Sequence, residues 1–217
     1  MNYYNIKICT CTLFAFVFLG CSVNQDMLKS EETEIKKVEY ERPAISMLLK
    51  NRIREILNTM SKNDLSKLNK EYIHPKFGFF NLYKINGTEI FLQQDKIYNI
   101  LEEQTDELSH IISRVNPDDS KLKIIEKNIK FDCSPNDDAF YGWNGEGLYL
   151  SNKMDISLSS MMKKLDTYTE SEYKKALKIE ETSYKIVLTP ELTFYLSKID
   201  NNWYITLVDR ITTDCSS

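Results

Sequence analysis

The chain has 217 residues, of which 42% are hydrophobic and 28% are charged, and its formal net charge at pH 7 is −4. This length is enough for one sizeable domain, and no internal repeat divides it. Because the charge balance is acidic and no basic stripe with interleaved aromatic residues is present, the composition excludes a nucleic-acid-binding protein.

The amino-terminal segment has the features of an export signal. One cation, Lys7, precedes an apolar run at residues 13–19. The run is too short for a membrane span, which needs about 20 apolar residues. Residues 18–21 (FLGC) resemble the lipobox of bacterial lipoproteins, which implies that residues 1–20 are removed and that diacylglycerol is attached to Cys21. The alternative is an ordinary signal peptide that is cut at another position.

The lipobox resemblance also implies a location in the bacterial cell envelope, where the lipid anchor binds the protein to a membrane. In lipoproteins, Ser22 in place of an aspartate leaves the protein free for export to an outer membrane, where it faces the periplasm if the host has one. Residues 21–43 are charged and have few large apolar side chains, which predicts a solvated tether that ends at Pro43. A single folded domain is expected over residues 44–217.

Export changes the cysteine count. Of the five cysteines, Cys9 and Cys11 leave with the signal and Cys21 carries the lipid. Cys133 and Cys215 remain in an oxidising compartment, where two thiols are expected to form a disulfide. Such a bond would fix a carboxyl-terminal tail that otherwise frays. Two unpaired thiols are the alternative.

Two helices are expected at the start of the domain. Apolar residues recur every three or four positions between residues 45 and 60, which predicts an amphipathic helix. Ser61 and Asp64 are candidate N-caps of a second, shorter helix, and His74 ends it because a residue before proline avoids helical angles. The apolar face of the first helix comprises Ile45, Leu48, Leu49, Ile53, Ile56, Leu57 and Met60.

A β-hairpin and a third helix follow. Residues 77–85 (FGFFNLYKI) are predicted to form a strand, Asn86 and Gly87 a tight turn, and residues 88–92 (TEIFL) the returning strand. A third helical pattern begins near Asp95 and continues towards residue 115, before Asn-Pro stops it.

The rest of the chain predicts further helices and a terminal meander. Residues 121–131 suggest one strand, and residues 157–181 one or two surface helices. Residues 184–188 (YKIVL), 192–199 (LTFYLSKI) and 203–211 (WYITLVDRI) alternate in period two, which predicts three antiparallel strands. The residues expected on one face of these strands are Tyr184, Ile186, Leu188, Leu192, Phe194, Leu196, Trp203, Ile205 and Leu207.

This order of elements predicts an α+β domain with helices on one side of an antiparallel sheet. The helix pair leading into YIHPKFGF and the closing FYLSKIDNNWYITLVDRITTDCSS resemble small exported bacterial proteins with the nuclear transport factor 2-like fold. The resemblance implies a cone in which a curved antiparallel sheet wraps around the N-terminal helices. Such proteins often end in a tryptophan-bearing strand followed by an aspartate and a cysteine.

The alternation places Asp209 on the inward face, where a lone carboxylate is costly unless it is paired or lies at an open mouth. In the cone fold the mouth holds ligands and catalytic acids. The resemblance therefore implies a pocket lined by Asp209, His74 and tyrosines such as Tyr83 or Tyr184, with Trp203 nearby. The alternative is that Asp209 lies past the sheet edge and pairs with an arginine or a backbone amide. Similarly, His74 at a helix end more often caps carbonyls than transfers protons.

Two functions remain open. The first is a non-catalytic, lipid-anchored module that binds a small molecule, a peptide or a neighbouring envelope protein. The second is an acid/base enzyme of the isomerase or dehydratase type that uses Asp209 and His74, which requires both groups within reach of one substrate position. An immunity or adhesion role of surface loops is a third alternative. No metal or other cofactor is expected, because the two histidines are far apart in the sequence and the cysteines are already assigned.

Overall fold

The chain divides into two units, Met1–Glu39 and Tyr40–Ser217. The expected signal peptide, Cys21 and the tether up to Pro43 lie outside the described residues. The described fold is therefore that of the domain expected over residues 44–217. In this computed structural model the described residues are 44–99, 108–134, 142–165 and 167–215.

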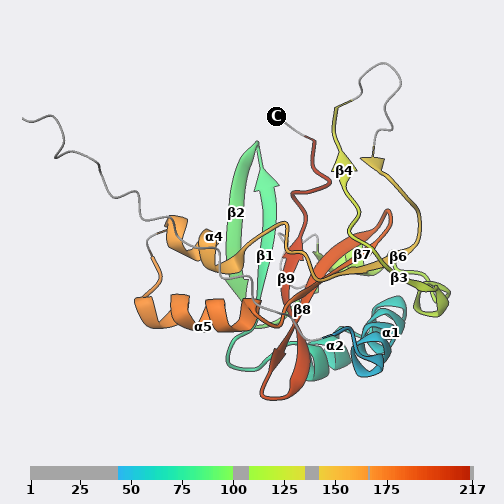
Figure 1. The fold of residues 1–217 in the computed structure, drawn as a ribbon, viewed down its shortest axis with the longest axis horizontal. Coiled ribbons are helices and arrows are strands. Elements are labelled where there is room, and N and C mark those ends of the chain that lie inside the picture. Colours follow the sequence, from blue (N-terminus) through green and yellow to red (C-terminus); the bar gives the residue numbers. More distant parts are fainter. Residues whose placement is uncertain (1–43, 100–107, 135–141, 166, 216–217) are drawn as a thin grey trace, which may run out of the picture. The chain divides into compact units, whose positions relative to one another are not determined.

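A seven-stranded sheet organises the domain (Figure 1), with the strand order β2-β1-β9-β8-β7-β6-β3. Neighbouring strands are antiparallel except in the pairs β1–β9 and β3–β6, which are parallel. A second, two-stranded sheet pairs β4 with β5. The strands are β1 (Phe79–Ile85), β2 (Thr88–Gln94), β3 (Ile124–Glu126), β4 (Phe131–Asp132), β5 (Gly142–Trp143), β6 (Leu148–Ser151), β7 (Tyr184–Leu188), β8 (Leu192–Ile199) and β9 (Asn202–Asp209).

Helix starts carry side-chain caps that satisfy free backbone N–H groups. Ser46 Oγ accepts the N–H of Leu49 at the start of α1, and Asp64 caps α2 as predicted. Thr169 and Glu172 form a capping box at the start of α5. Among the described residues, no helix has the length and apolar character that crossing a membrane requires. The helices are α1 (Met47–Ser61), α2 (Leu65–Tyr72), α3 (Leu108–Ile112), α4 (Leu158–Leu165) and α5 (Glu170–Glu180), with a short 3-10 turn at Asp119–Lys121.

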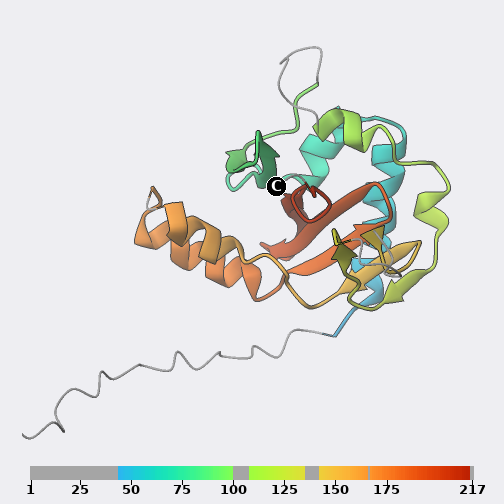
Figure 2. The same cartoon turned by 90° about the horizontal axis from the view of Figure 1, so that it is seen from above.

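The sheet has helices on both faces, not on one as predicted (Figure 2). We call the face that packs on α1, α2 and α3 the inner face. On the opposite, outer face, α4 and α5 cover the apolar side chains of β1 and β9. The β4–β5 pair covers the outer face of β6 and β7 through Trp143 and Phe131. The α+β class is confirmed, and the second layer forms because the outer face also carries large apolar residues.

The predicted hairpin is confirmed. Asn86 and Gly87 connect β1 to β2 with φ angles of 50° and 79°, as a two-residue hairpin turn requires. At the other end of the pair, a Cβ on Gly78 would lie 2.0 Å from the carbonyl oxygen of Gln94. The hairpin therefore depends on glycine at both of its ends.

A β-bulge reverses the predicted alternation in the last strand. Ile205 and Leu207 pair with adjacent residues of β8, so Thr206 is an additional residue inserted between them. Ile205 packs in the inner core, whereas Leu207 packs on the outer face. Asp209 follows on the outer face, where it pairs with Leu82 of β1. The prediction that Leu207 and Asp209 point inward was therefore wrong.

The third predicted helix is described in part. α3 covers Leu108–Ile112, residues 95–99 are not helical, and residues 100–107 lie outside the described residues. The backbone N–H of Ile97 donates to Oδ1 of Asn69 at 2.7 Å, and Nδ2 of Asn69 donates to the carbonyl of Ile97 at 2.9 Å. These bonds replace the ones that a helix would make.

Candidate functional site

A disulfide holds the carboxyl-terminal tail. Cys133 follows β4, Cys215 follows β9, and their Cα atoms lie 5.4 Å apart in the bonded pair. This distance lies within the usual range for a disulfide. The bond connects the two-stranded sheet on the outer face to the end of the main sheet. The tail is therefore fixed near its last described residue.

Asp209 fixes the other end of the same tail. Its side chain is 4% exposed, and its Oδ1 accepts the N–H groups of Ile211 and Thr212 at 3.1 and 3.0 Å. The hydroxyl of Thr212 donates to Oδ2 at 2.6 Å. Burial raises the pKa of Asp209, while these hydrogen bonds and the charge of Lys185 lower it to a smaller extent. The carboxylate thus pairs with backbone amides, as in the alternative, but Asp209 is the last residue of β9 and does not lie past the sheet edge.

The side chain of His74 forms hydrogen bonds with the turn that precedes β1. Its Nδ1 accepts the N–H groups of Lys76 and Phe77 at 3.2 and 3.0 Å. Its Nε2 lies 3.5 Å from a carboxylate oxygen of Asp200, and its ring packs edge-on against Tyr204. His74 therefore stabilises the turn after α2 and does not cap the carbonyls of that helix.

The structure does not bring His74 and Asp209 together. His74 contacts Tyr204, near the start of β9, and Asp209 is the last residue of that strand. Five residues of strand span about 16 Å at roughly 3.3 Å per residue. Acid/base catalysis on one substrate needs both groups within hydrogen-bond reach of it. This geometry gives no support to the pair as a catalytic unit.

The aromatic residues that were predicted to line one pocket lie in two different places in the structure. Tyr184 is 1% exposed and packs against Trp203 in the inner core, with ring centroids 5.7 Å apart. These two rings are part of the core. Tyr83, in contrast, is half-buried and shares a pocket with Asp209. Of the predicted pocket residues, the structure therefore brings together these two.

This pocket lies where β1 and β9 end and β8 begins, and its volume is about 230 Å³. The guanidinium of Arg210 lies 5.1 Å from the centre of the Tyr83 ring. Lys84 Nζ donates to the backbone carbonyl of Asp214 at 3.4 Å, so the tail forms one wall. Thr193 is 3% exposed, and its hydroxyl has no hydrogen-bond partner in the described part of the chain. The other lining residues are Ile111, Pro190, Glu191, Leu192, Asp209 and Thr213.

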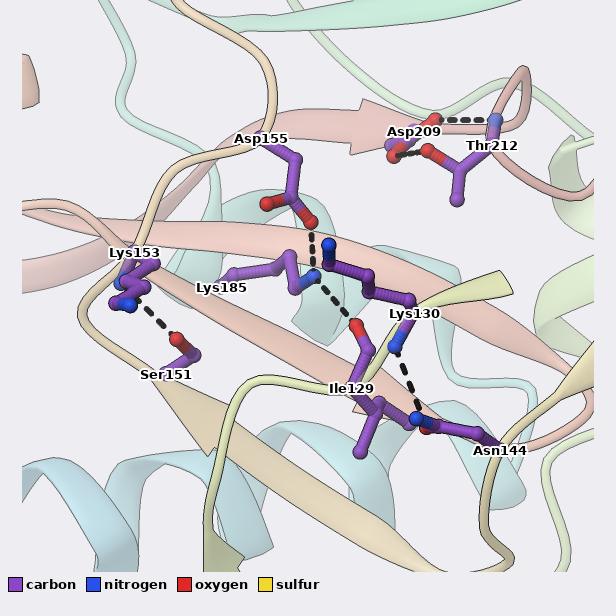
Figure 3. A network of polar contacts seen from close by, with 9 residues as sticks. All are labelled: Ile129, Lys130, Asn144, Ser151, Lys153, Asp155, Lys185, Asp209 and Thr212. Atoms are coloured by element: carbon purple, nitrogen blue, oxygen red, sulfur yellow. Dashed lines mark hydrogen bonds and ion pairs between the residues drawn. The ribbon is translucent and has the colours of Figure 1, made fainter. Parts of the chain in front are cut away.

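A buried ion pair lies on the outer face of the sheet (Figure 3). Lys185 is 2% exposed, and its Nζ pairs with Asp155 and donates to the carbonyl of Ile129 at 3.2 Å. Tyr195, opposite Lys185 on β8, is also buried. Burial raises the pKa of Tyr195, and the charges of Asp209 and Asp155 raise it further, while interactions with the backbone of Ile156 and Asp155 lower it to a smaller extent.

Sequence reasoning missed this ion pair. Period-two alternation puts Lys185 on the face opposite Tyr184 and Ile186, and a lysine in that position normally reaches solvent. The signal that was available is the apolar character of Val187, two residues along on the same face. It indicates that the outer face of β7 is covered as well.

No family model, curated protein or solved structure matches this chain. Within the described ranges, no three His, Cys, Asp or Glu side chains come together as a metal site would need. What the fold and the site define is a disulfide-bonded α+β domain with a small polar pocket at one end of its sheet.

Proposed function

We propose that this chain is an exported bacterial lipoprotein, anchored by Cys21 to a membrane of the cell envelope and, where the host has an outer membrane, facing the periplasm. The observation that carries the proposal is the pairing of Cys133 with Cys215. These are the two cysteines that remain as thiols after signal removal and lipidation. Disulfides persist in exported proteins and are rare in the cytosol.

The domain is of the nuclear transport factor 2-like cone type in this proposal. Its support is the position of α1 and α2 under the inner face of a long sheet and the order of residues at the chain end. Trp203 lies at the start of the last strand, Asp209 ends it and Cys215 follows. This is the order that the sequence resemblance implies.

The domain acts as a non-catalytic binding module for a small molecule, a peptide or a protein partner. Tyr83, Arg210 and Thr193 give its pocket an aromatic ring, a cation and a buried hydroxyl. The groups that an acid/base enzyme would need are already engaged, since Asp209 holds the tail and His74 holds a turn. The geometry therefore favours binding over catalysis.

Metabolic labelling tests the anchor. Cells that express the full chain are grown with alkyne-tagged palmitate, and label is expected in a membrane-bound protein that begins at Cys21. The matched control is Cys21→Ala, which keeps the whole domain and should lose both the label and the membrane fraction. Label on neither chain, with the wild type in the soluble cytosol, would refute the anchor.

A pocket-filling substitution tests the binding role. Thr213 is exposed and lines the pocket, so Thr213→Trp is expected to fill it without loss of core packing. Native mass spectrometry of the purified protein should show a retained small molecule in the wild type and none in the variant. The control is Ser171→Trp, at an exposed position of α5 that does not line the pocket, which should keep the retained mass. The same bound mass in all three proteins would contradict this site.

A further inference from the structure

The two edges of the main sheet differ in how well they are protected. At one edge, β3 has only three residues and is flanked by the exposed Lys123 and Lys127. At the other, β2 has seven residues and stays in unbroken register with β1 from Thr88 to Gln94. In the described part of the chain, no strand pairs with the outer edge of β2.

Natural sheets protect a free edge with short strands, lysine, proline or a bulge, because its backbone N–H and C=O groups can bind another strand. β3 has two of these features. β2 (TEIFLQQ) has none of them, and Glu89 is its single charged residue. Its Leu92 is also 43% exposed on the inner face. The edge therefore has the properties of a strand that binds a further strand.

We propose that β2 pairs antiparallel with β2 of a second copy of this chain, about a two-fold axis at Phe91. Phe91 is the middle residue of β2, so this is the register in which all seven residues of both strands are paired. The two main sheets then continue as one. The β2 edge of each copy is then paired with the β2 edge of the other, so neither can bind a third copy and the assembly closes as a dimer.

The side chains of β2 are complementary to themselves in this register. Residues directly opposite each other in an antiparallel pair lie on the same face, with Cβ atoms about 5 Å apart. Ile90 lies opposite Leu92 of the second copy, which covers the exposed leucine of each chain. Glu89 lies opposite Gln93 of the second copy, so no two like charges meet. This self-complementarity favours a second copy over an unrelated strand.

Two substitutions of Gln93 test the register. Gln93→Lys puts a lysine opposite Glu89 of the second copy at both symmetric positions, whereas Gln93→Glu puts two carboxylates there. The Gln93 amide donates a 2.8 Å hydrogen bond to the Phe77 carbonyl, which a lysine ammonium can replace and a glutamate carboxylate cannot. Urea denaturation of each variant therefore measures the change within the monomer separately from the change in dimer Kd. Because opposite charges attract and like charges repel across an antiparallel pair, and each substitution acts at two symmetric positions, we expect the dimer Kd of the two variants to differ by about tenfold.

The measurement is sedimentation velocity over a concentration series, on protein purified from the cell fraction that contains it. The wild type should form a concentration-dependent dimer, tighter for Gln93→Lys and weaker for Gln93→Glu, with the difference reduced by salt. The control Ile85→Lys changes an exposed apolar residue of β1 and should leave the dimer intact. A monomer at all concentrations, an open series of larger species, or equal Kd values for both Gln93 variants would overturn the proposal.

Discussion

The hydroxyl of Thr212 donates a 2.6 Å hydrogen bond to Oδ2 of Asp209, so the last side chain of β9 holds the turn that follows it. The same carboxylate accepts two backbone N–H groups of that turn. Together with the disulfide at Cys215, Asp209 fixes the tail that forms one wall of the pocket. Of the two interpretations of Asp209, a ligand pocket or a pairing with neighbouring groups, the structure therefore has the pairing.

Replacing this carboxylate should destabilise the domain. Asp209→Asn keeps one acceptor oxygen and puts an NH2 group where the hydroxyl of Thr212 now donates, so about 1–2 kcal/mol of the free energy of unfolding should be lost. Urea denaturation measures the change. The control is Glu170→Gln, which removes an exposed ion pair with Lys174 and should cost less than about 0.5 kcal/mol. Equal, small effects of both substitutions would contradict the structural role of Asp209.

Asp209 also predicts a pH dependence. Its pKa in the folded protein is raised above the ordinary value of 3.8, so between these two values the folded state binds more protons than the unfolded state. Its contribution to stability is therefore present at acid pH and is lost as pH rises through the raised pKa. The difference in free energy of unfolding between the wild type and Asp209→Asn should shrink over that interval. A difference that grows with pH would mean that the folded protein favours the ionised form.

The buried ion pair predicts an asymmetry between its partners. Lys185 is 2% exposed, whereas the side chain of Asp155 is 41% exposed. Asp155→Ala leaves a buried ammonium without its carboxylate and should cost about 3 kcal/mol or more. Lys185→Met leaves a carboxylate that water can reach and should cost less than about 1 kcal/mol. Urea denaturation of both variants and of the double variant tests this, and equal costs for the two single variants would contradict it.

The disulfide should contribute strongly to stability. It closes a loop with a sequence separation of 82, for which the chain-entropy estimate is about 4.5 kcal/mol. The double variant Cys133→Ser, Cys215→Ser should lose up to this amount in urea denaturation. A reductant should bring the wild type to the same stability and leave the variant unchanged. A wild type that does not respond to reductant would show that the two sulfurs are not bonded to each other.

Local patterns predicted the elements whose contacts are local. The face of α1, the cap at Asp64 and the Asn86-Gly87 turn follow from residues within a few positions of one another, and the structure has each of them. Leu48 is an exception, since it is 75% exposed although its spacing predicts burial. A helix face predicted from spacing is wider than the strip that the sheet covers.

Features that depend on distant residues did not follow from the sequence. The parallel pairing of β1 with β9 joins strands at opposite ends of the domain. The bulge at Thr206 has no glycine to mark it, and one inserted residue moves Asp209 from one face to the other. Similarly, residues 95–99 have a helical sequence pattern but are not helical, because Asn69, 28 positions before Ile97, binds the backbone of Ile97. These contacts decide which predicted site residues meet.

Export, lipidation and the disulfide can be tested together by the intact mass of the protein from its native membrane fraction, before and after reduction. We expect a chain that lacks residues 1–20, carries acyl groups on Cys21 and gains two hydrogens when the Cys133–Cys215 bond is reduced. A full-length, unacylated polypeptide from the cytosol, with an unchanged mass after reduction, would contradict it.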